Sequence, residues 1–240
     1  MKIGIIGAIQ EEIKKFKNLI QYYKKDIVGY TKIYIGEFKN FEIILIQSGI
    51  GKVSASVATT ILINLYKPKY IINIGSAGSL DSMLKIGDII IPTQICYHDV
   101  DLVNFGYSFG QIPGFPAQFH NNTILCNLLK DTAIKYKFNF FCGLLISGDS
   151  FIRKDNFIKT LHSKFSTAIA VEMESASIAQ VCHQFNMPFI IVKYISDTSD
   201  NTATVQFKKN VYTTSFSLFH LIKKMLENMI DITILSNLNI

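Results

Sequence analysis

The amino-acid sequence predicts an α/β fold with a mostly parallel sheet. Short β-branched and aliphatic runs, typical of buried strands, alternate with longer stretches in which apolar residues recur every three or four positions, as on amphipathic helices. This alternation continues over the whole chain of 240 residues. The chain has no Pro-, Gly- or Ser-rich linker and no internal repeat, so we expect a single domain over residues 1–240.

The predicted strands are short apolar runs bounded by residues that favour turns. The first ends at a glycine, and two later runs flank Lys39–Asn40, as expected of a hairpin. Pro92 separates two further runs, and Gly75–Gly78 is expected to close the run before it. In chain order, the expected strands are Lys2–Gly7, Ile33–Ile35, Glu42–Gln47, Lys69–Ile74, Asp88–Ile91, Gln94–His98, Phe140–Ile146, Ala168–Val171 and Phe189–Ile195.

The predicted helices carry apolar residues at three- and four-residue steps, which place one stripe on one helix face. The terminal helix shows this best, since its stripe runs from Phe207 through Leu218 to Met229. A turn-rich segment with many Gly, Pro and aromatic residues, Asp99–Gln118, lies between the two halves of the pattern. In chain order, the expected helices are Glu11–Lys24, Val53–Tyr66, Asn122–Tyr136, one from about Lys154, Ser175–Gln184 and Val205–Met229.

The composition excludes several classes of protein. With 49% hydrophobic and 18% charged residues, the chain has enough apolar surface to fold, which excludes a disordered or collagenous protein. Polar residues interrupt the apolar runs well before the roughly 18–20 residues that a membrane-spanning helix needs, so we expect no membrane association. The net charge of +6 comes from scattered lysines without the pattern of RNA-binding proteins, so we expect no nucleic-acid partner.

The cysteines and the N-terminus indicate a cytoplasmic protein. Cys96, Cys126, Cys142 and Cys182 form no CxxC motif, so we expect neither a disulfide framework nor a metal site. The first residues pass directly into a strand-like run and lack the features of a secretory signal.

Acidic residues follow several predicted strands, at the edge where open α/β sheets bind their ligands. Any one of them could simply stabilise the start of a helix. Crowded on one edge, they would repel one another and lose solvent, which raises pKa values towards the range of general acid–base catalysis. The spacing does not distinguish Glu172 from Glu174. The acidic residues concerned are Glu11, Glu12, Asp149, Glu172, Glu174 and Asp197.

Two glycine-containing segments are compatible with ligand binding. Gly75–Gly78 permits either the close approach of a ligand or a tight turn. Gly49–Gly51 precedes a predicted helix, but it lacks the third glycine and the later acidic residue of a dinucleotide-binding fingerprint, which excludes such a site.

A series of motifs spread over nearly the whole chain matches those of one known family. The motifs are Lys2–Ala8 with Glu11 and Glu12, Ser48–Val53, Asn73–Gly78, Tyr97–Asp99, Phe105–Tyr107, Gly110–Gly114, Ser147–Phe151, Ala170–Glu174 and Ile195–Asp197. By these motifs the chain resembles the 5′-methylthioadenosine/S-adenosylhomocysteine nucleosidases, a family of the nucleoside phosphorylase superfamily. The resemblance implies a three-layer α/β/α sandwich with a mixed, mostly parallel sheet, a homodimer, and no cofactor or metal.

The same resemblance implies roles for individual residues. Asp197 would give a proton to N7 of adenine, Glu12 would activate the attacking water, and Glu174 would accept hydrogen bonds from the ribose hydroxyls. The residues implied to surround the substrate are Met173 under the ribose, Ile152 and Phe151 at adenine, and Ser76, Gly78, Ile9, Ile50 and Phe207. The residues implied to reach the neighbouring subunit's 5′-alkylthio pocket are Leu102, Phe105 and Pro113.

The implied reaction is hydrolysis of the N-glycosidic bond of methylthioadenosine, adenosylhomocysteine and 5′-deoxyadenosine, as part of methionine salvage. Arg153 is the single arginine of the chain, whereas phosphorylases usually hold phosphate with arginine. The sequence therefore favours hydrolysis. A purine nucleoside phosphorylase and a non-catalytic nucleoside-binding protein are the alternatives. Lys193 departs from the family, since many members have arginine there.

Overall fold

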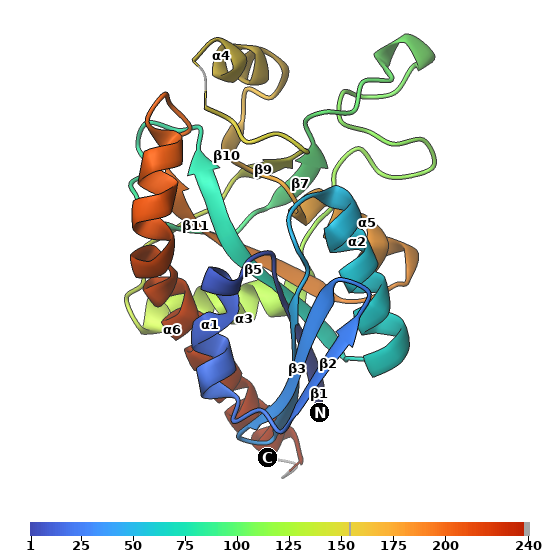
Figure 1. Ribbon diagram of the computed structural model, residues 1–240, viewed down its shortest axis with the longest axis vertical. Coiled ribbons are helices and arrows are strands. Elements are labelled where there is room, and N and C mark those ends of the chain that lie inside the picture. Colours follow the sequence, from blue (N-terminus) through green and yellow to red (C-terminus); the bar gives the residue numbers. More distant parts are fainter. Residues whose placement is uncertain (154, 238–240) are drawn as a thin grey trace.

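The computed structural model describes residues 1–153 and 155–237. In this part of the chain, all strands belong to one mixed sheet of eleven strands (Figure 1). The strands are β1 (Lys2–Gly7), β2 (Lys24–Val28), β3 (Thr31–Phe38), β4 (Phe41–Gln47), β5 (Tyr70–Ser79), β6 (Ile89–Ile90), β7 (Gln94–Tyr97), β8 (Phe140–Phe141), β9 (Leu144–Ser147), β10 (Ala168–Glu172) and β11 (Phe189–Asp197).

Helices cover both faces of the sheet. The terminal helix packs on β11 and contacts two other helices on the same face, and a second pair of helices packs together on the opposite face (Figure 1). The helices of the first face are α1 (Gln10–Leu19), α3 (Thr123–Lys135) and α6 (Ala203–Asn237). Those of the second are α2 (Lys52–Ile61), which continues as a π-helix over Leu62–Tyr66, and α5 (Ser175–Gln184). The expected three-layer α/β/α sandwich is therefore confirmed.

Two short elements lie apart from these layers. Helix α4 (Asp155–Lys164) and the loop that carries a 3-10 turn at Val103–Phe105 both lie at the upper end in Figure 1, beyond the ends of β7, β9 and β10. The described helices include none that is both long enough and apolar enough to cross a membrane.

Strand β5 is the centre of the sheet, because it is hydrogen-bonded to three other strands. Its first half pairs in parallel with β1, and β11 pairs in parallel along most of its length. Strand β10 approaches from the opposite direction and pairs antiparallel with β5 only at Gly78 and Ser79. As a result, β1 ends beside the middle of β5, and β10 and β11 end beside its last residues.

The two hydrophobic cores lie on either side of this sheet. One is formed by isoleucines of β1 and β5 packed against α1, α3 and α6, and the other by the opposite sheet face against α2 and α5. The strands with side chains buried on both faces read in the sequence as continuous apolar runs, as expected of a central parallel sheet.

The structure differs from the sequence prediction most clearly in three places. The first helix ends at Leu19, because Gln21 adopts a left-handed backbone with φ of 38° and the chain continues into β2. The segment Gly75–Gly78 does not close a strand but belongs to β5. The run predicted as one strand over Phe140–Ile146 forms two, because β8 pairs with β6 whereas β9 pairs with β7 and β10.

We expect Gly36→Ala to destabilise the protein by about 1–3 kcal/mol, as overpacking usually does. A Cβ on Gly36 would lie 2.3 Å from the carbonyl oxygen of Ile20 and 2.6 Å from Cα of Tyr22. These are backbone atoms, and Ile20 is fixed there because its carbonyl accepts the N–H of Glu37 at 2.8 Å. Urea denaturation measures the change.

The exposed neighbour provides the control for this substitution. Glu37→Ala should change the unfolding free energy by no more than about 0.5 kcal/mol. Equal midpoints for the two variants would show that the chain can shift at Gly36 without cost.

Candidate active site

A cavity of about 340 Å³ lies where the ends of β1, β10 and β11 meet β5. This volume is within the range of small-molecule binding sites. The structure brings together here every residue predicted to act on the substrate within one subunit. These residues are Ile9, Glu12, Ile50, Ser76, Gly78, Phe151, Ile152, Met173, Glu174, Asp197 and Phe207. The cavity is also lined by Ala8, Ala77, Ser150, Val171, Glu172, Ser196 and Ser199.

Glu12 is held in the cavity wall by four hydrogen bonds. It lies in the first turn of α1, where its Oε2 accepts the backbone N–H groups of Ala8 at 2.8 Å and Ile9 at 3.3 Å. Its Oε1 accepts the N–H of Ser76 at 2.9 Å and the hydroxyl of Ser76 at 3.0 Å. These donors fix the side chain between the end of β1 and the end of β5, with one edge facing the cavity.

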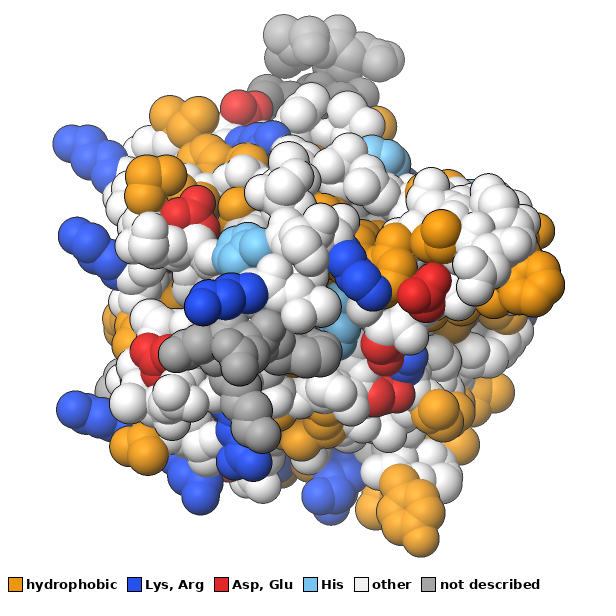
Figure 2. Space-filling model, turned by 90° about the horizontal axis from the view of Figure 1, so that it is seen from above, with side chains coloured by type: hydrophobic (Ala, Val, Ile, Leu, Met, Phe, Trp, Pro, Cys, Tyr) orange, Lys and Arg blue, Asp and Glu red, His pale blue; other side chains and the backbone are white. Residues whose placement is uncertain are grey.

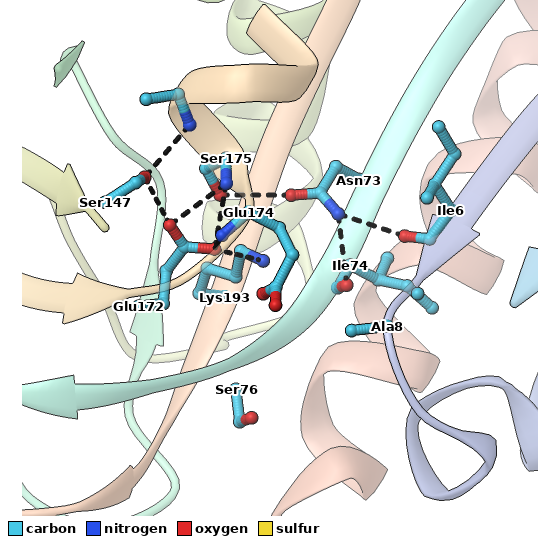
Figure 3. A network of polar contacts seen from close by, with 12 residues as sticks. Ile6, Ala8, Asn73, Ile74, Ser76, Ser147, Glu172, Glu174, Ser175 and Lys193 are labelled. Atoms are coloured by element: carbon cyan, nitrogen blue, oxygen red, sulfur yellow. Dashed lines mark hydrogen bonds and ion pairs between the residues drawn. The ribbon is translucent and has the colours of Figure 1, made fainter. Parts of the chain in front are cut away.

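Glu172, in the cavity wall, forms a buried ion pair with Lys193 behind it (Figure 3). The Nζ of Lys193 lies 3.0 Å from Oε2 of Glu172, and both side chains are almost fully buried. Glu172 also accepts the hydroxyl of Ser147 and the N–H groups of Glu174 and Ser175. Burial raises the pKa of Glu172, but the Lys193 ammonium and these donors outweigh it and hold the pKa below its ordinary value.

The ammonium of Lys193 also lies close to Glu12. A Cβ on Gly75 would be 3.0 Å from Oε1 of Glu12 and 3.1 Å from Nζ of Lys193, so both groups occupy the space that glycine leaves empty. Burial lowers the pKa of Lys193, but attraction by the surrounding carboxylates, Glu172 foremost, more than compensates and holds it above its ordinary value. Lys193 therefore carries the positive charge of this site.

Glu174 lies at the N-cap of α5, and its Oε1 accepts the N–H of Gly51 at 2.8 Å. Burial raises the pKa of Glu174 to about 8, and the nearby charge of Glu172 adds to the effect. Lys193 and the Gly51 N–H oppose this shift without cancelling it. The carboxyl group of Glu174 is therefore harder to ionise than that of an ordinary glutamate.

Asp197 ends β11 on the other side of the cavity. Its Oδ2 accepts the hydroxyl of Ser196 at 2.8 Å, and its Oδ1 accepts the N–H of Ser199 at 3.0 Å. Burial raises its pKa, because these hydrogen bonds only partly offset the loss of solvent. A raised pKa favours the protonated form of a carboxyl group, the form that can donate a proton.

Aromatic and aliphatic side chains form the rest of the lining. Phe151 and Phe207 meet edge to face with ring centroids 5.9 Å apart, and Phe151 is 43% exposed. Ile50, between the two glycines that precede α2, is 57% exposed. Ile152 is buried deeper. An apolar lining with a few oriented carboxyl groups is typical of a site for a small, mostly apolar ligand.

The structure does not bring Leu102, Phe105 and Pro113 to this cavity. They lie on the loop after β7, which extends away from the sheet (Figure 1). Phe105 is 77% exposed and Pro113 is also exposed.

Comparison with known proteins places these features in a family. Residues 2–227 match the phosphorylase superfamily. The 5′-methylthioadenosine/S-adenosylhomocysteine nucleosidase of Buchnera aphidicola subsp. Acyrthosiphon pisum (strain Tuc7) is 58% identical over 231 residues, covering 96% of this chain and 100% of that protein. The nucleosidase of the same name from Staphylococcus aureus (strain bovine RF122 / ET3-1) is 42% identical over 206 residues, covering 86% of this chain and 90% of that protein.

This chain belongs to the phosphorylase superfamily and, within it, to the 5′-methylthioadenosine/S-adenosylhomocysteine nucleosidase family. A solved structure agrees: the nucleosidase of Neisseria meningitidis, in complex with methylthio-immucillin-A, superposes with a TM-score of 0.92 at 35% identity. The superposition covers 95% of this chain and 99% of that chain. The family resemblance predicted from the sequence motifs is thus confirmed.

Sequence reasoning left three polar residues of this nucleosidase-family site without a role. The spacing does not show which of Glu172 and Glu174 faces the substrate. In the structure, Glu172 lies opposite Ser147 in the pairing of β10 with β9, which explains why it accepts the Ser147 hydroxyl. Ser196 was visible only as part of the Ile195–Asp197 motif, and Ser199 carried no signal. Short serine side chains next to an acid become recognisable only once the chain is folded.

Basic side chains are dispersed over the end of the molecule that carries α4 and the loop after β7 (Figure 1 and Figure 2). In the view from above, lysines stand apart from one another with acidic and apolar groups between them (Figure 2). Among the described residues, no group of three or more His, Cys, Asp or Glu side chains is arranged to hold a metal ion.

We expect Glu174→Gln to stabilise the protein more at pH 8 than at pH 5. Between the ordinary pKa of 4.5 and the raised value of about 8, the folded protein keeps a proton that the unfolded chain loses. The wild-type unfolding free energy should therefore fall with pH in this window, by up to about 1.4 kcal/mol per pH unit from this group. Glutamine cannot ionise and removes that slope, which denaturation at pH 5, 6.5 and 8 measures.

The exposed carboxylate of Glu37 provides the matched control. Glu37→Gln should leave the pH dependence of stability parallel to that of the wild type. If the pH dependence of stability of Glu174→Gln were also parallel to that of the wild type, burial would not oppose the ionisation of Glu174.

Proposed function

We propose that the protein hydrolyses the N-glycosidic bond of 5′-methylthioadenosine and S-adenosylhomocysteine, releasing adenine and the corresponding thioribose. The observation that carries the proposal is the convergence of Glu12, Glu174 and Asp197 on one cavity, from three distant parts of the chain. The 58% identity to a nucleosidase of this name over nearly the whole chain supports the choice of substrates. We further propose 5′-deoxyadenosine as a substrate and methionine salvage as the setting.

Asp197 supplies the proton for the leaving group. Adenine leaves poorly as an anion, so protonation at N7 must accompany cleavage of the bond. The raised pKa of Asp197 favours the protonated acid before reaction. After transfer, the Ser196 hydroxyl and the Ser199 N–H stabilise the carboxylate that remains.

Glu12 activates the water that attacks the sugar carbon. Its carboxylate oxygens accept four hydrogen bonds, which is about their full capacity. The hydroxyl of Ser76 is the one donor among these that can rotate away, which frees a lone pair for the proton of water. The backbone donors keep the carboxylate oriented during this exchange.

Glu174 responds to the positive charge of the sugar. Glycosidic cleavage passes through an oxocarbenium-like state, as in the hydrolysis of O-glycosides. Hydrogen bonds from the ribose hydroxyls and a positive charge nearby both favour the ionised form of Glu174. The unfavourable burial of its charge in the free site is thereby relieved in the transition state, which is the form of binding that accelerates a reaction.

The electrostatics of the cavity favour water over phosphate as the nucleophile. No lysine or arginine is among the described residues that line it. Lys193 lies behind the wall and is paired with Glu172, and Arg153 is exposed to solvent. A phosphate dianion would meet carboxylates without a cation to neutralise it.

Wild-type protein should release adenine from methylthioadenosine equally well in phosphate-free and phosphate buffers. Chromatography of free adenine measures this directly. Release only in the presence of phosphate would instead identify a phosphorylase.

Asp197→Asn should lower kcat by about 10²- to 10⁴-fold, the usual contribution of one proton-transfer group. The amide keeps the size of the side chain but has no proton to give to N7. Substrate binding, measured by calorimetry, should persist. A variant with nearly normal turnover would remove Asp197 from the reaction.

We also propose that the chain acts as a single nucleosidase domain and as a homodimer in the cytoplasm. The exposed face of α2 and the π-helix carries Val53, Val57 and Leu65, which are 74%, 48% and 62% exposed. A second copy packed there would cover this apolar surface and could receive Leu102, Phe105 and Pro113 at the 5′ end of the substrate. The four cysteines are free, which suits a reducing compartment.

Val57→Asp should convert a dimer into monomers and raise KM for methylthioadenosine, because a buried charge without a partner opposes association. Sedimentation and steady-state kinetics measure both effects. Ile134→Asp is the control, because Ile134 is 66% exposed on α3 in the opposite helix layer. A monomeric wild type with full activity would contradict this proposal.

A further inference from the structure

A buried serine hydroxyl lies in the cavity wall next to Asp197. Ser199 lines the cavity, and its side chain has no exposed surface. Within the described residues, its Oγ has no hydrogen-bond partner. A buried hydroxyl without a partner is unfavourable and is rare in native proteins. Its position at a ligand cavity indicates that a ligand supplies the missing partner.

The backbone holds Ser199 in this place at some cost. Its φ of 55° is in the left-handed region, which residues other than glycine rarely adopt and which occurs often at ligand sites. This turn directs the N–H of Ser199 to Oδ1 of Asp197 at 3.0 Å. The same turn places the hydroxyl over Gly78, on the strand opposite.

Gly78 shows how close the hydroxyl is to the proposed acid. A Cβ at this position would lie 2.2 Å from Oγ of Ser199 and 2.9 Å from Oδ1 of Asp197. The Ser199 hydroxyl and the Asp197 carboxyl group thus both lie against the point where a side chain at position 78 would begin. Only glycine fits there. Asp197 already accepts one hydrogen bond on each oxygen, whereas the hydroxyl accepts none.

The chemistry of adenine supplies a partner for this hydroxyl. On one edge of the base, N7 is an acceptor and the adjacent 6-amino group is a donor. If Asp197 protonates N7, as the proposed function requires, an oxygen beside Asp197 lies towards the 6-amino group. We propose that Ser199 is a specificity-determining residue whose hydroxyl accepts a hydrogen bond from the 6-amino group of the base. This inference rests on the proposed function.

Two variants and two substrates test the contact. Ser199→Ala and Ser199→Gly both remove the hydroxyl, and glycine also relieves the left-handed backbone, so that variant should fold even if alanine does not. Each is assayed with methylthioadenosine and with its analogue that carries hydrogen in place of the 6-amino group. We expect kcat/KM for methylthioadenosine to fall about three- to tenfold, and kcat/KM for the analogue to stay unchanged.

Asn201→Ala provides the matched control, because Asn201 is exposed on the same loop. It should leave both substrates unaffected. Unchanged rates for both substrates in the Ser199 variants, or an equal loss on both, would overturn the contact, the second result showing that the hydroxyl acts through Asp197 instead. If the wild type released no base from either nucleoside, the proposed function would fail, and this inference with it.

Discussion

The buried ion pair between Lys193 and Glu172 is the interaction on which the site depends. Taking two charges out of water is costly unless hydrogen bonds satisfy both partners. Here Glu172 accepts the ammonium, the Ser147 hydroxyl and the first N–H groups of α5. One carboxylate thereby ties the ends of β9 and β10 and the middle of β11 to the start of α5. Since Glu174 caps that helix, its position follows from the pair.

The pair also decides how charge is distributed among the remaining acids. Because Glu172 takes most of the influence of Lys193, the buried Glu174 keeps a raised pKa. The pKa of Asp197 is raised by its own burial, and Glu12 is oriented by backbone donors. Similar side chains thus acquire different tasks from their surroundings. Lysine has no planar guanidinium fork with which to bind a carboxylate in a bidentate way. The hydroxyl of Ser147 and the backbone N–H groups of Glu174 and Ser175 provide the additional hydrogen bonds to Glu172.

Much of the fold could be predicted because central strands, buried on both faces, are recognisable in the sequence as continuous apolar runs. The pattern found β1, β4, β5, β10 and β11, and with them the edge where the acids gather. It missed β2, an edge strand whose exposed lysines resemble a solvated helix end, and the division between β8 and β9, which reflects a change of partners rather than of composition. The local sequence of a strand does not show which other strand it pairs with.

The rigid setting of β5 has a consequence for how a nucleoside reaches the cavity. Gly78 lies between β10 and β11, and Ser76 is held by β11 on one side and by its N–H bond to Glu12 on the other, so both form a fixed floor. The wall that contacts solvent is made instead by Phe151 and Ile50 from loops, both partly in water, and by Phe207 of α6, which meets Phe151 edge to face. The opening of the cavity is therefore bordered by side chains, which can change rotamer without any rearrangement of the sheet.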